Sequence, residues 1–116
     1  MEQNTRQQKV GRVIQKELGE ILQFEMKEKF PGMMITVTKV QVTKDLSIAR
    51  IFLSLFGAKD KPAALEQVKQ NGGEFRYRLG NRVAKQLRIV PQLEFFEDDS
   101  LDYIENIERL LDDDDE

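Results

Sequence analysis

The chain has 116 residues, of which 40% are hydrophobic, and its formal net charge is −3. This composition suffices for one domain with a hydrophobic core and excludes a chain that is disordered throughout. The sequence contains no cysteine and no histidine, which excludes disulfide bonds, thiolate chemistry, and the most common metal ligand and near-neutral general base. The polar N-terminus and the lack of a long apolar run predict a cytoplasmic protein that does not span a membrane.

The first expected element is an amphipathic helix. Apolar residues recur at helical spacing between residues 10 and 22, so that they form one buried face. Thr5 is the expected N-cap of this helix. The sequence Phe30-Pro31-Gly32 is expected to end it.

A β-hairpin is predicted next. Residues 34–43 alternate between apolar and polar side chains, with a shift of phase at Thr38-Lys39 that is typical of a β-bulge. Residues 48–56 form a second and more apolar strand. The connection through residues 44–47 is too short for a crossover, so the two strands must be antiparallel.

Two helices with a break between them are expected after the hairpin. Asp60 or Lys61 is the expected cap of the first, whose small apolar face lies within residues 63–68. The sequence Asn71-Gly72-Gly73 is expected to interrupt it, because these residues readily adopt positive φ. The next helix is predicted from about residue 74 to 86, with an inner face that repeats every four residues: Phe75, Leu79, Val83 and Leu87.

Residues 87–96 are predicted to form a third strand. Pro91 cannot donate to a strand ladder, so this strand lies at an edge or carries a bulge. Ser100 is expected to cap a final amphipathic helix that ends near Leu111. The chain is therefore predicted to be one α+β domain over residues 1–111, in which helices cover one face of a three-stranded sheet, followed by an acidic disordered tail at 112–116.

Charge is distributed unevenly along the chain. Residues 69–88 contain six cations and one acid, whereas residues 92–116 contain twelve acids and one base. A basic body with an acidic end is typical of a protein that binds nucleic acid, and the alternative is two solvated surfaces of opposite sign.

The basic residues around the helix break are the candidate binding site. Free N–H groups at the start of a helix bind phosphate, and the cations that follow would neutralise the next phosphates. Arg78, Arg82 and Lys85 fall on one stripe of the predicted helix, and within the helix only Glu74 is placed to pair with one of them. The predicted RNA-binding residues are Asn71, Gly72, Gly73, Arg76, Arg78, Arg82, Lys85 and Arg88.

Catalysis and metal binding have little support in the sequence. The carboxylates at Glu97-Asp98-Asp99 precede a capped helix, which is the expected place for a solvated loop. The acidic run 112–115 lacks the ligand spacing of a calcium loop. We therefore predict no catalytic residue, no metal site and no cofactor. Two other functions stay open: a protein–protein adaptor that uses its acidic C-terminal helix, and an RNA-processing enzyme with a carboxylate metal site.

Several segments of the chain resemble the ribosome-binding factor A family. They are residues 8–18, 35–40, 45–54 and, as the most specific, 87–101, with the sequence LRIVPQLEFFEDDSL. The resemblance covers the chain from about Thr5 to Leu111. At the helix break this family typically has Ala-x-Gly, whereas this chain has Asn71-Gly72-Gly73 followed by an acid.

The resemblance implies a type II K-homology fold, with the element order α-β-β-α-α-β and an added C-terminal helix. It also implies a non-catalytic assembly factor that binds the free small (30S) ribosomal subunit and its 16S ribosomal RNA during late maturation. The family is associated with processing of the 5′ end of 16S ribosomal RNA and with growth in the cold. A monomer with no cofactor is expected.

Overall fold

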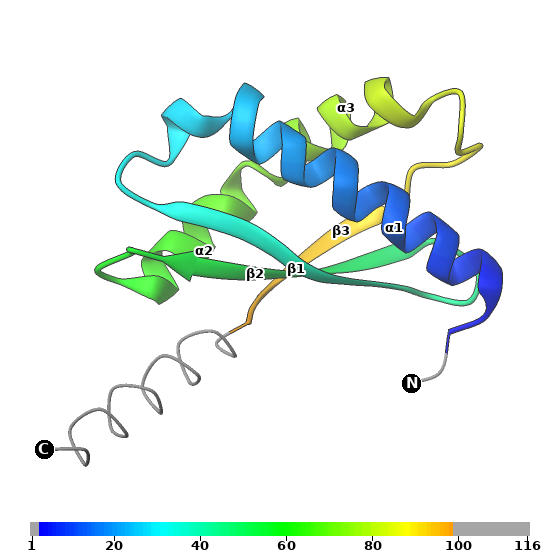
Figure 1. The fold of residues 1–116 in the computed structure, drawn as a ribbon, viewed down its shortest axis with the longest axis horizontal. Coiled ribbons are helices and arrows are strands. Elements are labelled where there is room, and N and C mark those ends of the chain that lie inside the picture. The colour runs from blue at the N-terminus through cyan, green and yellow to red at the C-terminus, as the bar shows by residue number, and fades with distance from the viewer. Residues whose placement is uncertain (1–2, 99–116) are drawn as a thin grey trace, which may run out of the picture.

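The computed structural model describes residues 3–98, which form a three-stranded mixed sheet with helices on one face (Figure 1). The elements follow the predicted order α-β-β-α-α-β as far as residue 98. The predicted C-terminal helix and the acidic tail at 112–116 lie outside the described residues.

The first helix, α1, spans Thr5–Glu20 and continues as a π-helical segment, η1 (Ile21–Glu25), and a short 3₁₀ segment, η2 (Lys27–Lys29). Its N-cap is Asn4, so the prediction of Thr5 was wrong by one residue. Asn4 Oδ1 accepts from the Gln7 backbone N–H at 2.8 Å, and the Asn4 N–H donates to Gln7 Oε1 at 2.9 Å. The buried Gln7 amide also donates to the Val42 carbonyl at 2.7 Å. This tertiary bond fixes Gln7 where it can complete the cap.

The hairpin has the predicted form. Strand β1 (Met34–Val42) pairs antiparallel with β2 (Ile48–Phe56), and the register shifts between Val37 and Lys39. The bulge is therefore confirmed at Thr38. In the turn, Leu46 has a positive φ of 63°, which is unusual for a residue other than glycine.

Helix α2 (Lys61–Gln70) is capped by Asp60, one of the two predicted caps, whose side chain accepts from the Ala63 N–H at 3.1 Å. Helix α3 spans Gly72–Val83 and thus ends about one turn earlier than predicted. Strand β3 (Gln92–Glu97) runs parallel to β2 at the edge of the sheet.

The predicted start of the third strand at Leu87 was wrong. Residues 87–91 form a loop, and the backbone carbonyls of Val90 and Pro91 accept from the Arg76 guanidinium at 2.8 and 3.2 Å. Pro91 lacks the N–H that a ladder needs, so the strand begins only after it. Strand β3 does lie at an edge of the sheet, which was one of the two predicted alternatives, although Pro91 precedes the strand.

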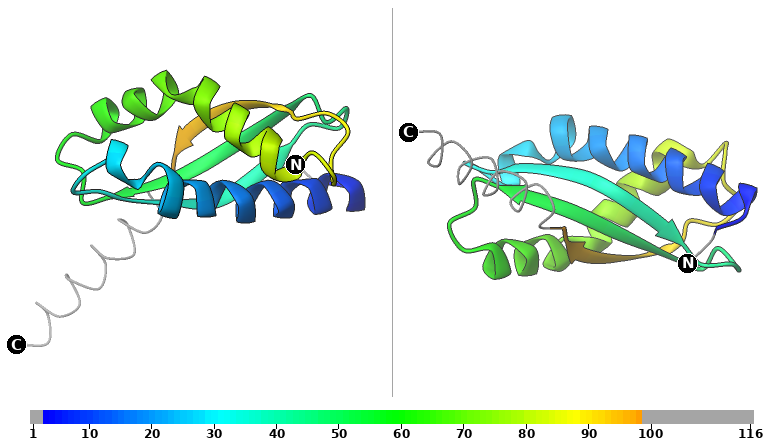
Figure 2. Two further views of the ribbon diagram at one scale, coloured as in Figure 1. Left: turned by 90° about the horizontal axis from the view of Figure 1, so that it is seen from above. Right: turned by 60° about the horizontal axis from the view of Figure 1, so that its bottom comes forward.

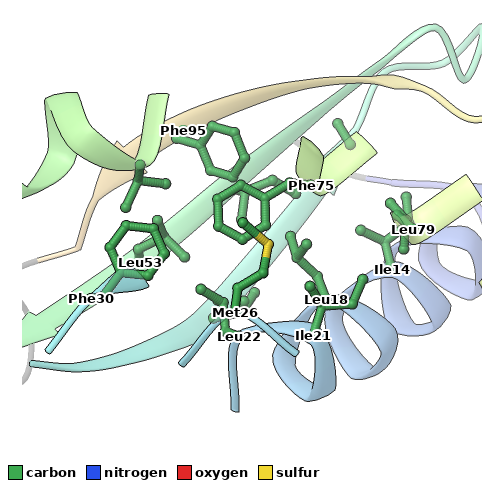
Figure 3. Packing of buried hydrophobic residues seen from close by; sticks show 14 of the residues in the cluster. Ile14, Leu18, Ile21, Leu22, Met26, Phe30, Leu53, Phe75, Leu79 and Phe95 are labelled. Atoms are coloured by element: carbon green, nitrogen blue, oxygen red, sulfur yellow. The ribbon is translucent and has the colours of Figure 1, made fainter. Parts of the chain in front are cut away.

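The core lies between the sheet and the helices, where α1 and α3 are side by side on the same face (Figure 2). Phe75 of α3 is fully buried at its centre, between Phe30 and Phe95, with ring centroids 6.1 and 5.6 Å away (Figure 3). This packing fixes α3, and with it the helix break, relative to β3.

Candidate nucleic-acid interface

The break between α2 and α3 consists of one residue, Asn71. Its side-chain Nδ2 donates to the Gln67 carbonyl at 2.8 Å, and its backbone carbonyl accepts from the Phe75 N–H at 3.0 Å. Gly72 and Gly73 are already the first residues of α3. The position of the break was predicted correctly, but the expected positive φ was wrong, because none of these three residues has one.

The two glycines instead leave the surface open. A Cβ atom at Gly72 would meet only the Phe95 ring, at 3.7 Å, and one at Gly73 would meet nothing within 4 Å. A ligand could therefore approach the backbone at the start of α3 closely.

Two hollows adjoin the break. The first, of about 440 Å³, lies beside α3, and we call it the Tyr77 hollow. The Tyr77 side chain is 71% exposed. The full lining is Gly73, Arg76, Tyr77, Gly80, Asn81 and Val90.

The second, of about 340 Å³, lies between the end of α2 and β3, and we call it the Phe96 hollow. Lys69 lines it from α2, and the partly exposed Phe96 lines it from β3. Gly72 belongs to this hollow and Gly73 to the other, so the two meet at the start of α3.

The acid that departs from the family pattern is neutralised. Glu74 pairs with Lys29 at 2.6 Å and with Arg78 at 2.8 Å. The hydrogen bond from Lys29, followed by that from Arg78, holds the pKa of Glu74 below its ordinary value. The carboxylate at the break is thus matched by two cations.

Arg78 and Arg82 bind acids that come from another part of the chain. Arg78 contacts Glu25 at 2.9 Å in addition to Glu74. Arg82 contacts Glu17 at 2.7 Å, Glu20 at 2.8 Å and Glu25 at 2.7 Å. Within α3, Glu74 pairs with Arg78 as predicted, but the interpretation of the stripe as unpaired cations was wrong, because α1 and η1 supply further acids.

These contacts form an ion-pair network between α3, the end of α1 and η1. Four carboxylates face four cations in it: Glu17, Glu20, Glu25 and Glu74 with Lys16, Lys29, Arg78 and Arg82, of which Lys16 contacts Glu17 at 3.9 Å. The hydrogen bond from Arg78 lowers the pKa of Glu25, and the hydrogen bond that Arg82 donates to Glu17 raises the pKa of Arg82. The network is not a surface of net positive charge.

The other predicted cations have different surroundings. Lys85 lies in the turn after the end of α3 and so does not extend its face, and Arg88 lies in the following loop. Both are exposed and make no ion pair with residues 3–98. Arg76 reaches across to the carbonyls before β3 and lines the Tyr77 hollow.

The site prediction omitted several residues that line the hollows, among them Lys69, Tyr77, Asn81 and the acid Glu94. Tyr77 lies between Arg76 and Arg78 in sequence and outside the buried face of α3. An aromatic residue between cations on a solvent-facing position was the signal that could have identified it.

Within residues 3–98 there is no group of three acidic, histidine or cysteine residues that could hold a metal ion. Nor is any helix in that range long and apolar enough to cross a membrane. The acidic C-terminal helix on which an adaptor function would depend lies outside that range.

Comparison with known proteins identifies relatives over most of the chain. The family model described as ribosome-binding factor A matches residues 6–111. Ribosome-binding factor A of Flavobacterium psychrophilum is 48% identical over 112 residues, which are 96% of this chain and 85% of that protein.

Two solved structures share the fold. The crystal structure of ribosome-binding factor A from Thermus thermophilus has a TM-score of 0.66 at 23% identity and covers 78% of this chain and 94% of its own. A homology model of the Thermus thermophilus factor, fitted into a cryo-EM map of a complex between the 30S subunit and that factor, has a TM-score of 0.62 at 24% identity. It covers 75% of this chain and 89% of its own.

Proposed function

This chain belongs to the ribosome-binding factor A family, and we propose that it is a non-catalytic assembly factor that binds the free small (30S) ribosomal subunit through 16S ribosomal RNA during late maturation. The name shared by its relatives and the complex with the 30S subunit in which the Thermus thermophilus factor was placed support this role. It would act as a monomer in the cytoplasm, without a cofactor.

The observation that carries the proposal is the pair of hollows that meet at the start of α3. Exposed Tyr77 offers a ring on which a base can stack, and such stacking contributes roughly 1–3 kcal/mol per base. Arg76 lines the same hollow as Tyr77, and Lys69 lines the Phe96 hollow; both carry cationic groups for phosphates. The open backbone at Gly72-Gly73 lets a strand approach between them.

The proposed RNA contacts are accordingly Asn71, Gly72, Gly73 and Arg76, together with Lys69 and Tyr77. Arg78 and Arg82 act mainly through the ion-pair network, because their guanidinium groups already bind carboxylates. RNA would have to displace these acids to reach them.

The direct test is binding of purified 30S subunits and of single-stranded 16S fragments at several salt concentrations. Replacing Lys69 by Glu should reduce the slope of log affinity against log salt by about 0.7–0.9, the value for one lost phosphate contact. Tyr77→Ala should weaken binding with little change in slope. Lys59→Glu is the matched control, because Lys59 is exposed and lies outside both hollows.

Sedimentation with free 30S subunits and with joined subunits then tests at which stage of ribosome assembly the protein binds. Binding to free subunits alone would support a role before subunit joining. Binding that depends on neither Lys69 nor Tyr77 and is insensitive to salt would refute RNA recognition and favour the adaptor function.

We also propose that the protein promotes processing of the 5′ end of 16S ribosomal RNA and growth in the cold, as the family resemblance implies. A deletion strain should accumulate 5′-extended 16S precursor and grow slowly at low temperature. The wild-type gene should correct both defects, and the Lys69→Glu, Tyr77→Ala double variant should not. Correction by that variant would separate these roles from the proposed RNA site.

A further inference from the structure

A third and larger hollow, of about 630 Å³, lies on the other side of the loop between α3 and β3. The first half of α1, the turn between β1 and β2, and residues 86–89 of the loop line it. Three of its lining residues are cations: Arg6 and Lys9 from α1 and Arg88 from the loop. We call it the Arg88 hollow.

The cations of the Arg88 hollow have no acidic partners. Arg6, Lys9 and Arg88 are exposed, and none makes an ion pair within residues 3–98. The one acid in the lining, Asp45, is engaged in its own turn. It accepts from the Ser47 hydroxyl at 2.7 Å and backbone N–H at 3.1 Å, and from the Thr43 hydroxyl at 2.8 Å.

Helix stability does not explain why Arg6 and Lys9 are there. Arg6 lies in the first turn of α1, and that turn contains no acid. A cation at a helix N-terminus is disfavoured by the helix dipole, which favours anions at this end. Arg6 and Lys9 are also three residues apart on one helix, so they repel each other in the free protein. A bound anion would relieve both effects.

The Arg88 hollow continues the site already described. Ile89 lines it, and the next residue, Val90, lines the Tyr77 hollow. The two hollows therefore lie on either side of one short loop, and the Ile89 side chain is 73% exposed on it. A strand that leaves the Tyr77 hollow over this loop would meet Arg88 and then the two cations of α1.

We propose that the Arg88 hollow binds the sugar-phosphate backbone of the RNA strand that continues from the Tyr77 hollow. Arg6, Lys9 and Arg88 bind its phosphates, and Ile89 contacts the strand where it crosses the loop. The proposal rests on the RNA-binding function proposed above and extends its site to a second surface.

The test compares two double charge reversals on the same helix. Arg6→Glu with Lys9→Glu changes the Arg88 hollow, whereas Arg12→Glu with Lys16→Glu changes the net charge of α1 equally but outside that hollow. Each protein is titrated with single-stranded 16S fragments of about four and about twelve nucleotides over a range of salt concentrations.

With the long fragment, the Arg6, Lys9 variant should lose about 1.4 from the salt slope, the value for two phosphate contacts of a single strand. This corresponds to about 25-fold weaker binding at 0.1 M salt, if 1 M salt abolishes the contribution. Binding of the short fragment, which fills only the Tyr77 hollow, should change much less. Should the charge reversal disturb folding, Arg6→Gln with Lys9→Gln serves instead, with the same predicted loss of slope.

The outcomes separate the two proposals. If Lys69→Glu weakens binding but the Arg6, Lys9 variant matches the Arg12, Lys16 control, the Arg88 hollow is not an RNA site and the proposed function stands. If neither Lys69→Glu nor the Arg6, Lys9 variant weakens binding, both proposals fail. If the Arg6, Lys9 variant loses 30S binding but binds RNA of both lengths normally, the hollow binds a protein, and the RNA assignment is overturned.

Discussion

Arg82 gives the sharpest test of whether the cations of α3 stabilise the fold or bind RNA. It contacts Glu17, Glu20 and Glu25 at 2.7–2.8 Å and so connects α3 to the end of α1 and to η1. Replacing it by alanine removes all three contacts and leaves carboxylates facing one another. We expect this change to destabilise the fold, whereas a free RNA-binding cation could be removed without that cost.

The size of the expected loss of stability follows from the solvent exposure of the three ion pairs. The Arg82 side chain is 31% exposed and that of Glu17 is 13% exposed, so water screens the network in part. Exposed ion pairs contribute about 0.2–1 kcal/mol each. Three such pairs, less the side-chain entropy that the arginine regains, give a loss of about 1–2 kcal/mol. For a domain of this size, that corresponds to a decrease in Tm of about 4–16 °C.

Thermal and urea denaturation at low and high salt measure this loss. Lys85→Ala is the control, since Lys85 is exposed and has no ion pair in the described part of the chain. The difference between the two variants should shrink at 1 M salt, where charges are screened. Arg82→Glu should be worse than Arg82→Ala, because it adds a fourth carboxylate to three. Equal stability of Arg82→Ala and Lys85→Ala at low salt, with RNA binding lost only in the former, would refute the structural role.

Three further predictions concern stability at acidic pH, the substitution of two glycines, and the deletion of residues 112–116. Because Glu25 and Glu74 have lowered pKa values, their contribution to stability is complete above about pH 4.5 and is lost as pH falls through the lowered values. In urea denaturation, the stability gap between wild type and Glu25→Gln should therefore close in acid; a gap that is constant from about pH 6 to 3 would contradict this. Gly72→Ala should raise Tm slightly, because alanine adds about 0.5–1 kcal/mol of helix propensity, whereas Gly11→Ala should lower Tm, because its Cβ would lie 3.3 Å from a backbone carbonyl of β1. Deleting residues 112–116 should leave Tm unchanged and raise affinity for random RNA at low salt, since five negative charges are removed; unchanged affinity would show that these residues only add solubility.

The sequence predicted those features that depend on neighbouring residues. Alternation of side chains located the first hairpin strand and its bulge at Thr38, and a run of mostly apolar residues located the second strand. The pair Asp60-Lys61 indicated the start of α2 to within one residue. The repeat of Phe75, Leu79 and Val83 identified the buried face of α3. Each of these signals lies within a few residues of the feature that it specifies.

The features that were missed depend on contacts between distant segments. The partners of Arg82 lie 57–65 residues earlier in the chain, so a search for acids one turn away on the same helix could not find them. Arg76 similarly holds the loop before β3 by two carbonyls 14 and 15 residues away. The sequence showed the number of cations near the break, but only the fold shows which of them are matched.

The order of charges along α1 explains why some cations near the break are matched by acids and others are not. Residues 5–16 contain four cations and no acid, whereas residues 17–25 contain three acids and no cation. Because α1 lies along α3, and the acids of its end and of η1 contact Arg78 and Arg82, this acidic segment neutralises the second half of α3. Its basic end lies beside the loop after α3, where it adds to the charge of Arg88. This order opposes the helix dipole at both ends, so it cannot serve the stability of α1 alone. We infer that α1 determines which part of the α3 surface stabilises the fold and which part is available to an anionic ligand.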